Sequence, residues 1–126
     1  MYRILVVDDE DNIRLLYERE LTKEGYAVEL ASSGDEALQM FEKNPPHLVV
    51  LDIKMPGLDG VNVLSRMMSI DNKMPIVLNT AYASYQDNFT TWAADAYVVK
   101  SSDLGELKTR IKAILRERYS ETKQGK

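Results

Sequence analysis

Acidic, hydroxyl and ammonium side chains follow the short apolar runs of this 126-residue sequence. They are Asp8 with Asp9, then Asp52, then Thr80 after Asn79, and finally Lys100. If the runs are parallel strands, their carboxyl ends meet at one edge of a sheet, where open α/β sheets bind ligands. Three carboxylates, a hydroxyl and an ammonium would then lie close together.

This combination of groups suits phosphoryl chemistry. Three neighbouring carboxylates need a cation, because like charges held together resist ionisation. Oxygen ligands without cysteine or histidine favour a hard divalent ion such as Mg²⁺, which leaves positions open for phosphate oxygens. Lys100 and Thr80 would add a positive charge and a hydrogen-bond donor. Asp52 could then attack phosphorus as a nucleophile, so the set predicts phosphoryl transfer onto Asp52.

Each of these residues alone also has an ordinary structural explanation. Acids ahead of a helix commonly cap it and suit its dipole, which explains Asp8 to Asp11 more often than a site does. Asp52 could be a loop aspartate, Thr80 could simply end a strand, and Lys100 could be a surface lysine. The prediction therefore depends on all of these strand ends carrying complementary groups.

The apolar runs alternate with helical patterns along the chain. The runs are continuous, as in parallel strands buried on both faces, and cover Ile4–Val7, Leu48–Leu51, Ile76–Leu78 and Tyr97–Val99. A further run, Ala27–Ala31, contains Glu29 and is typical of a strand nearer the edge. The alternation predicts an α/β fold with a parallel sheet, right-handed crossovers and helices on both faces.

Helix signals lie between the predicted strands. The first helix ends near Gly25 and has an apolar stripe at Ile13, Leu16, Tyr17 and Leu21. Ser33 and Glu36 form a capping-box pattern for the second helix. Further helices are expected after Asp59, over residues 84–93, where poor helix formers weaken the pattern, and from Asp103.

Composition excludes several other classes of protein. The chain has 16 basic and 20 acidic residues, a net charge of −4, which argues against non-specific nucleic-acid binding. The lack of cysteine excludes disulfides and thiol catalysis. The first apolar run is too short for a signal peptide, and no run approaches the ~18 residues of a membrane span. We expect a soluble cytoplasmic domain over residues 1–119, followed by a polar tail over residues 120–126.

Four longer motifs resemble the receiver domain of two-component response regulators, in particular the chemotaxis-regulator-like ones. They are Val6-Val7-Asp8-Asp9-Glu10, Leu51-Asp52-Ile53-Lys54-Met55-Pro56-Gly57-Leu58-Asp59-Gly60, Asn79-Thr80-Ala81 and Tyr97-Val98-Val99-Lys100. The resemblance covers the chain from about Arg3 to Arg116. It implies a flavodoxin-like, doubly wound sheet of five parallel strands in the order 2-1-3-4-5, with five helices.

The resemblance also implies a phosphoacceptor signalling module rather than an enzyme. Asp52 would accept a phosphoryl group from a histidine kinase or a histidine phosphotransfer protein. Mg²⁺, or Mn²⁺ in its place, would be bound by Asp9, Asp52 and the backbone carbonyl of Lys54. Asp8 would act on the metal mostly through water.

A switch near the site is implied as well. Thr80 and Lys100 would hold the phosphoryl oxygens, Thr80 would move inward, and Tyr97 would follow into a buried rotamer. The face formed by residues 84–93, the fifth strand and the last helix would then change shape. That face would control a downstream protein or an output domain outside this chain, without contact of this chain with nucleic acid or membrane.

Two positions depart from the family's pattern. The family usually has proline, preceded by a cis bond, after the lysine, but here Ser101 follows Lys100. A cis bond before a residue other than proline costs about 3–4 kcal/mol, so this loop is either strained or rebuilt with a trans bond. The family also often ends the preceding helix with glycine, where this chain reads Trp92-Ala93-Ala94-Asp95-Ala96.

Two other functions stay open at this point. A Mg²⁺-dependent phosphatase with an aspartyl nucleophile would use a similar sheet, but such enzymes usually have a second aspartate where this chain has Lys54. A flavodoxin-like FMN protein would bind phosphate at the loop after the first strand, where the acids from Asp8 to Asp11 would repel it. Phosphatase turnover or a yellow colour would support one or the other.

Overall fold

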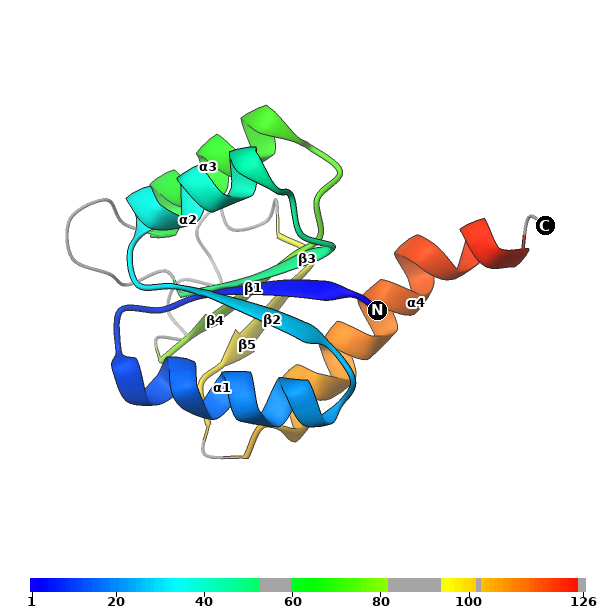
Figure 1. Cartoon of the computed structure of the whole chain (residues 1–126), viewed down its shortest axis with the longest axis horizontal. Helices are drawn as coiled ribbons and strands as arrows, with labels where there is room; N and C mark the ends of the chain where they lie inside the picture. Colours follow the sequence, from blue (N-terminus) through cyan, green and yellow to red (C-terminus); the bar gives the residue numbers. More distant parts are fainter. Residues whose placement is uncertain (53–59, 82–93, 102, 125–126) are drawn as a thin grey trace.

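Parallel strands form one sheet with helices on both faces in the computed structural model of the chain (Figure 1). The structure describes residues 1–52, 60–81, 94–101 and 103–124. The strands are β1 (Arg3–Val7), β2 (Ala27–Ala31), β3 (Leu48–Leu51), β4 (Ile76–Thr80) and β5 (Ala96–Val99). The helices are α1 (Asp11–Lys23), α2 (Gly34–Lys43), α3 (Gly60–Ile70) and α4 (Gly105–Gln124). The strand order is β2-β1-β3-β4-β5, which confirms the predicted topology.

Side chains alternate along the central strands and fill two apolar cores, one on each face of the sheet. Ile4 and Val6 pack with α1 and α4, whereas Leu5 and Val7 pack with α2 and α3. Every residue of β3 and β4 is buried, which explains why these strands are continuous apolar runs. β2 lies at an edge, as Glu29 within its run indicates.

The predicted caps of the first two helices are present. Gly25 has a φ of +96° and donates its N–H to the Thr22 carbonyl at 3.0 Å. Glycine adopts this left-handed conformation without strain, so α1 ends there. The Ser33 hydroxyl accepts the Glu36 amide at 3.2 Å and caps α2. The Gly25 cap ends α1 just before β2 begins, and the Ser33 cap starts α2 just after β2 ends.

Several element boundaries differ from those expected from the sequence. β4 continues through Asn79 to Thr80, so both residues pair with β5 instead of following the strand. α4 begins at Gly105, whose amide donates to the Asp103 carboxylate at 2.8 Å. α4 also continues to Gln124, through most of the expected polar tail, because the glutamate, lysine and glutamine there favour helix.

The loop after β5 uses a trans peptide bond. The described part of the chain contains no cis bond, so the Lys100–Ser101 bond is trans and the loop is rebuilt around serine. The Ser101 hydroxyl accepts the Asp103 amide at 3.1 Å and turns the chain toward α4. The helix expected over residues 84–93 lies outside the described residues. None of the described helices has the length and apolar character needed to cross a bilayer.

An aromatic cluster of Tyr2, His47 and Tyr119 closes the amino-terminal end of the sheet, with ring centroids 5.2–5.5 Å apart. His47 Nδ1 accepts the Arg3 amide at 2.9 Å, and the Tyr119 hydroxyl donates to the His47 carbonyl at 2.7 Å. Burial, helped by the charges of Arg3 and the N-terminus, lowers the pKa of His47 below 6.5. His47 in the native protein is therefore neutral at pH 7.

We expect the free energy of unfolding to fall as the pH drops below 6.5, the ordinary pKa of histidine. The unfolded chain then binds a proton that native His47 resists, and the loss continues until the pH passes the lowered native pKa. His47→Asn keeps an acceptor near Nδ1 but does not titrate. Its urea midpoint should change less than that of the wild type between about pH 7.5 and 5.5, and equal changes would contradict the prediction.

Candidate functional site

Asp8 and Asp52 lie side by side because each follows the last residue of a central strand. β1 and β3 pair with Val7 opposite Leu51, and the Asp52 amide donates to the Val7 carbonyl at 3.0 Å. Successive side chains point to opposite faces of a strand. Asp8 and Asp52 therefore both project to the face covered by α1. Both are buried, whereas Asp9 is exposed.

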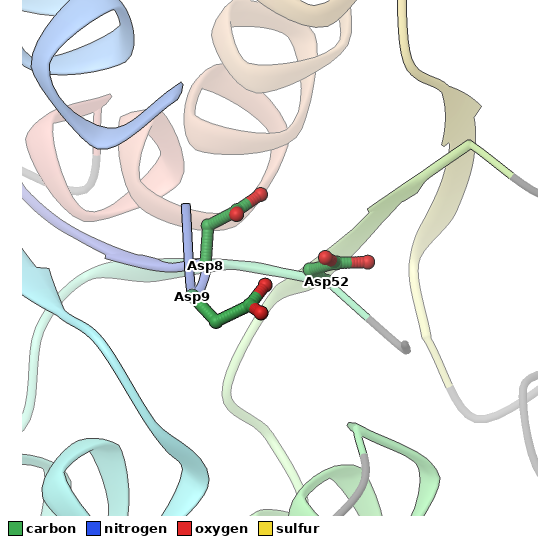
Figure 2. Close-up of side chains that lie close together, drawn as sticks. All are labelled: Asp8, Asp9 and Asp52. Atoms are coloured by element: carbon green, nitrogen blue, oxygen red, sulfur yellow. The ribbon is translucent and has the colours of Figure 1, made fainter. Parts of the chain in front are cut away.

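The carboxylates of Asp8, Asp9 and Asp52 converge on a small space at the carboxyl edge of the sheet (Figure 2). One oxygen from each lies within 4.8 Å of the other two. Ligand oxygens around Mg²⁺ lie at most about 4.2 Å apart, so small rotations bring these oxygens into range. The donors are all hard oxygens, which Mg²⁺ prefers. The three residues therefore fit a divalent metal, while Lys54 lies outside the described residues.

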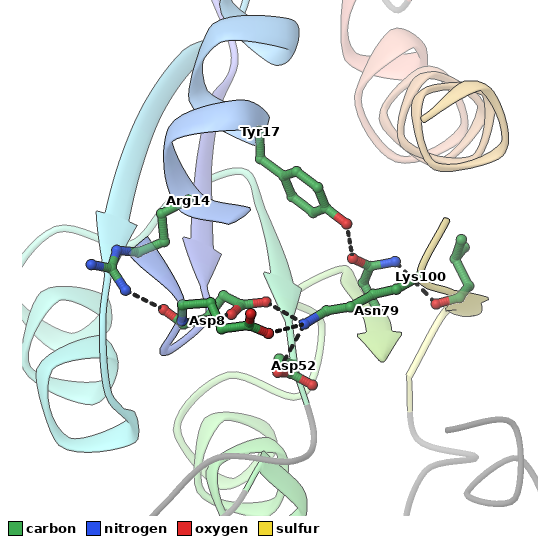
Figure 3. A network of polar contacts seen from close by, with 8 residues as sticks. Asp8, Arg14, Tyr17, Asp52, Asn79 and Lys100 are labelled. Atoms are coloured by element: carbon green, nitrogen blue, oxygen red, sulfur yellow. Dashed lines mark hydrogen bonds and ion pairs between the residues drawn. The ribbon is translucent and has the colours of Figure 1, made fainter. Parts of the chain in front are cut away.

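Lys100 contacts two of these acids, Asp8 and Asp52, and also approaches Glu10 (Figure 3). Its Nζ lies 2.7 Å from Asp8 Oδ2, 3.2 Å from Asp52 Oδ2 and 3.9 Å from Glu10 Oε1. Burial lowers the pKa of Lys100, but the hydrogen bond to Asp8 and the charges of Asp52 and Asp8 outweigh it and hold the pKa above its usual value. The ammonium is therefore charged at neutral pH. It offsets one of the three carboxylates, and one divalent cation would balance the two negative charges that remain.

Thr80 lies in β4, the neighbour of β3, and Tyr97 lies in β5, the neighbour of β4. Thr80 is the last residue of β4, is fully buried, and accepts the Lys100 amide through its carbonyl at 2.7 Å. Tyr97 is half-buried in β5 and packs against the core beneath α2 and α3. The structure thus brings together Asp8, Asp9, Asp52 and Lys100 directly. It places Thr80 and Tyr97 in neighbouring strands, and their roles in a switch stay predictions.

Three polar residues near the site were missed by the sequence analysis as functional candidates. Arg14 Nη1 donates to the Asp8 carbonyl at 2.7 Å and so holds the loop after β1. The Tyr17 hydroxyl donates to Asn79 Oδ1, and Asn79 Nδ2 donates to the Val98 carbonyl at 3.0 Å. Tyr17 had been assigned only to an apolar stripe. A buried tyrosine hydroxyl needs a partner, and polar Asn79 at the end of an apolar run was the available signal.

We expect Asp9→Asn to weaken Mg²⁺ binding more than Asp8→Asn does. Asp8 accepts the Glu10 amide at 2.9 Å and pairs with Lys100, whereas Asp9 is exposed at the rim and better placed to bind the metal directly. Loss of a water-mediated partner should cost about 10- to 100-fold in affinity, and loss of a direct ligand should cost more. Calorimetric titration with MgCl₂ measures both, and equal losses would contradict this order.

The sequence matches known proteins over most of its length. A family model for the response regulator receiver domain matches residues 4–112. The chain is 42% identical over 120 residues to the transcriptional regulatory protein PrrA of Mycobacterium tuberculosis, covering 94% of this chain and 52% of PrrA. It is 46% identical over 116 residues to the probable transcriptional regulator ycf27 of Pyropia yezoensis, covering 90% and 47%. The chain thus spans about half the length of these curated relatives.

Solved structures agree with the sequence matches. The response regulator protein TrrA of Thermotoga maritima, crystallised in complex with Mg²⁺-BeF, has a TM-score of 0.89 and 47% identity, covering 91% of this chain and 100% of TrrA. TrrA in complex with the histidine kinase ThkA has a TM-score of 0.87 and 47% identity, covering 91% and 99%. This chain therefore belongs to the response regulator receiver domain family of two-component systems.

Proposed function

We propose that this receiver domain accepts a phosphoryl group on Asp52 and acts through its phosphorylation state rather than through turnover of a substrate. The observation that carries the proposal is the position of the Lys100 ammonium, which contacts Asp8 and Asp52 at 2.7 and 3.2 Å beside three converging carboxylates. A charged donor is then already in place for phosphoryl oxygens. The Mg²⁺-BeF complex of TrrA supports the same site chemistry.

The phosphoryl transfer is a displacement at phosphorus. An Asp52 carboxylate oxygen forms the new P–O bond, the P–N bond of a donor phosphohistidine breaks, and its electron pair stays on the imidazole, which takes up a proton. Lys100 moves from its carboxylate partners to the phosphoryl oxygens, and the Thr80 hydroxyl donates to one of them. Mg²⁺, or Mn²⁺, bound by Asp9, Asp52 and the Lys54 carbonyl would neutralise the carboxylates and the incoming phosphoryl oxygens.

The phosphoryl donor in this proposal is a histidine kinase or a histidine phosphotransfer protein, both of which present phosphohistidine. The complex of TrrA with the kinase ThkA supports a kinase partner. The output is a change at β5 and α4 that follows when Thr80, at the end of β4, moves inward and Tyr97 becomes more deeply buried. A downstream protein, or an output domain such as the remaining half of the longer transcriptional regulators, would respond to it in the cytoplasm.

Labelling with a small phosphodonor tests the proposal. Acetyl phosphate with Mg²⁺ should add one acid-labile phosphate per chain, detected by intact mass, and peptide mapping should place it on Asp52. Chelation of the metal should prevent the addition. No label on the folded protein, or a label on another residue, would overturn the proposal, and sustained hydrolysis of a phosphate ester would favour the phosphatase alternative.

A further inference from the structure

A buried polar bridge joins helix α1 to strands β4 and β5 beside the acids (Figure 3). The Tyr17 hydroxyl donates to Asn79 Oδ1, and Asn79 Nδ2 donates to the Val98 carbonyl at 3.0 Å. We call these three residues the Asn79 bridge. Tyr17 is 2% exposed and Asn79 is 3% exposed. Both side chains are almost completely shielded from bulk water, so each depends on a hydrogen-bond partner within the protein.

The Asn79 bridge lies next to the residues proposed to hold the phosphoryl oxygens. Thr80 follows Asn79 directly, and Lys100 follows Val98 after one residue. Asn79 and Val98 are partners in the sheet register, and the Lys100 amide donates to the Thr80 carbonyl at 2.7 Å just beyond them. The side-chain bond from Asn79 and the backbone bond from Lys100 therefore hold the ends of β4 and β5 together at Thr80 and Lys100.

Helix α1 connects the Asn79 bridge to the acids. Arg14 lies one helical turn before Tyr17 on the same side of α1. Its Nη1 donates to the Asp8 carbonyl at 2.7 Å. α1 thus contacts the loop after β1 through Arg14 and the end of β4 through Tyr17. The metal-binding side and the phosphoryl-oxygen side of the site are linked through a single helix.

We propose that Tyr17 and Asn79 are positioning residues for phosphorylation of Asp52, because they hold Thr80 and Lys100 in place relative to the acids. This inference rests on the proposed function above. Burial raises the pKa of Tyr17 to about 12, although nearby Lys100 opposes the shift. The hydroxyl therefore keeps the proton that it donates to Asn79 throughout the neutral range.

A hollow of about 170 Å³ lies beside the Asn79 bridge. It makes it possible to test whether Tyr17 positions Asn79 without unfolding the protein. Its lining includes Tyr17, Asn79, Val98 and Leu107. This space accommodates several water molecules at about 30 Å³ each. In a Tyr17→Phe variant, water entering the hollow can donate to Asn79 Oδ1. The variant is therefore expected to fold, but with Asn79 no longer anchored to α1.

The test compares the rate of phosphorylation by acetyl phosphate in the wild type, Tyr17→Phe and Tyr119→Phe. Tyr119 is a matched control, because its hydroxyl also bonds to the protein, donating to the His47 carbonyl at the far end of the sheet. Tyr17→Phe should react about tenfold more slowly. Its Mg²⁺ affinity should stay within about twofold of the wild type, because β1 and β3 position the acids. Tyr119→Phe should match the wild type in both.

A double variant separates positioning from a purely structural role. Tyr17→Phe with Asn79→Leu removes both partners of the Tyr17–Asn79 bond, and such paired apolar replacements cost little stability. Water in the hollow, which Val98 also lines, can donate to the Val98 carbonyl in place of Asn79 Nδ2. The urea midpoint should recover toward the wild-type value while phosphorylation stays slow. Rates that follow the urea midpoint across all variants, or equal rates in Tyr17→Phe and Tyr119→Phe, overturn the inference. A wild-type protein that takes up no phosphate overturns the proposed function instead.

Discussion

An Asp52→Asn variant should take up no phosphate from acetyl phosphate and Mg²⁺ under conditions that label the wild type completely. The carboxamide lacks the anionic oxygen that attacks phosphorus. The fold should be retained, because Lys100 keeps its 2.7 Å contact with Asp8 and one of three mutually repelling charges is removed. Intact-mass spectrometry after a fixed labelling time measures the effect, and urea unfolding confirms that the variant is folded.

Asp71→Asn is the matched control for this substitution. Asp71 accepts the Lys73 amide at 2.9 Å in the turn between α3 and β4, at the end of the sheet opposite the acids. The same chemical change there should leave labelling at the wild-type level. A phosphorylated Asp52→Asn variant would show that another residue is the acceptor. An unlabelled Asp71→Asn variant would show that an aspartate-to-asparagine change can abolish labelling through the fold, without removing the acceptor.

Lys100→Met should make the stability of the protein depend strongly on metal. The Lys100 side chain is 14% exposed and pairs with two buried carboxylates. Removing one partner from such a buried group of charges costs several kcal/mol at most, and we expect about 2–3 kcal/mol in metal-free buffer. Saturating Mg²⁺ should restore most of this loss, since a ligand at about 100 times its Kd stabilises by about 2.7 kcal/mol.

The same variant should bind Mg²⁺ more tightly and react more slowly. The metal no longer competes with an ammonium for Asp8 and Asp52, so we expect an affinity gain of about tenfold. Phosphorylation should slow because the phosphoryl oxygens lose their charged donor. Lys108→Met is the control, since Lys108 also contacts two carboxylates, Glu20 and Glu24, but at the surface. Stabilisation by Mg²⁺ that is no larger in Lys100→Met than in Lys108→Met would contradict this account.

The sequence was sufficient to predict the sheet order and the cluster at its edge. Asp8, Asp52 and Lys100 each end an apolar run, and parallel strands bring their carboxyl ends to one edge whatever the details of packing. The resemblance to receiver domains supplied the order of the strands. Alternation along β1, β3 and β4 also determines that Asp8, Asp52 and Asn79 share a face.

Features that depend on contacts between distant elements could not be predicted in this way. The bond from Tyr17 to Asn79 requires the rotation of α1 over the sheet, which the apolar stripe alone does not specify. The shared position of Lys100 between two acids depends on how the rebuilt loop at Ser101 leaves β5. The polarity of residues 120–126 alone suggests a frayed tail, but glutamate, lysine and glutamine favour helix, and α4 extends to Gln124.

The central position of β1 and β3 affects the order of events during folding. The first 51 residues hold three adjacent strands, β2, β1 and β3, so Asp8 and Asp52 can meet across a separation of 44 residues. Lys100 reaches Asp8 across 92 residues, and only after β4 has paired with β3 and β5 with β4. Asp8 and Asp52 therefore come together early, before β5 brings the Lys100 ammonium to them. The transition state for folding then carries uncompensated carboxylates, and divalent cations should raise the folding rate and not only slow unfolding.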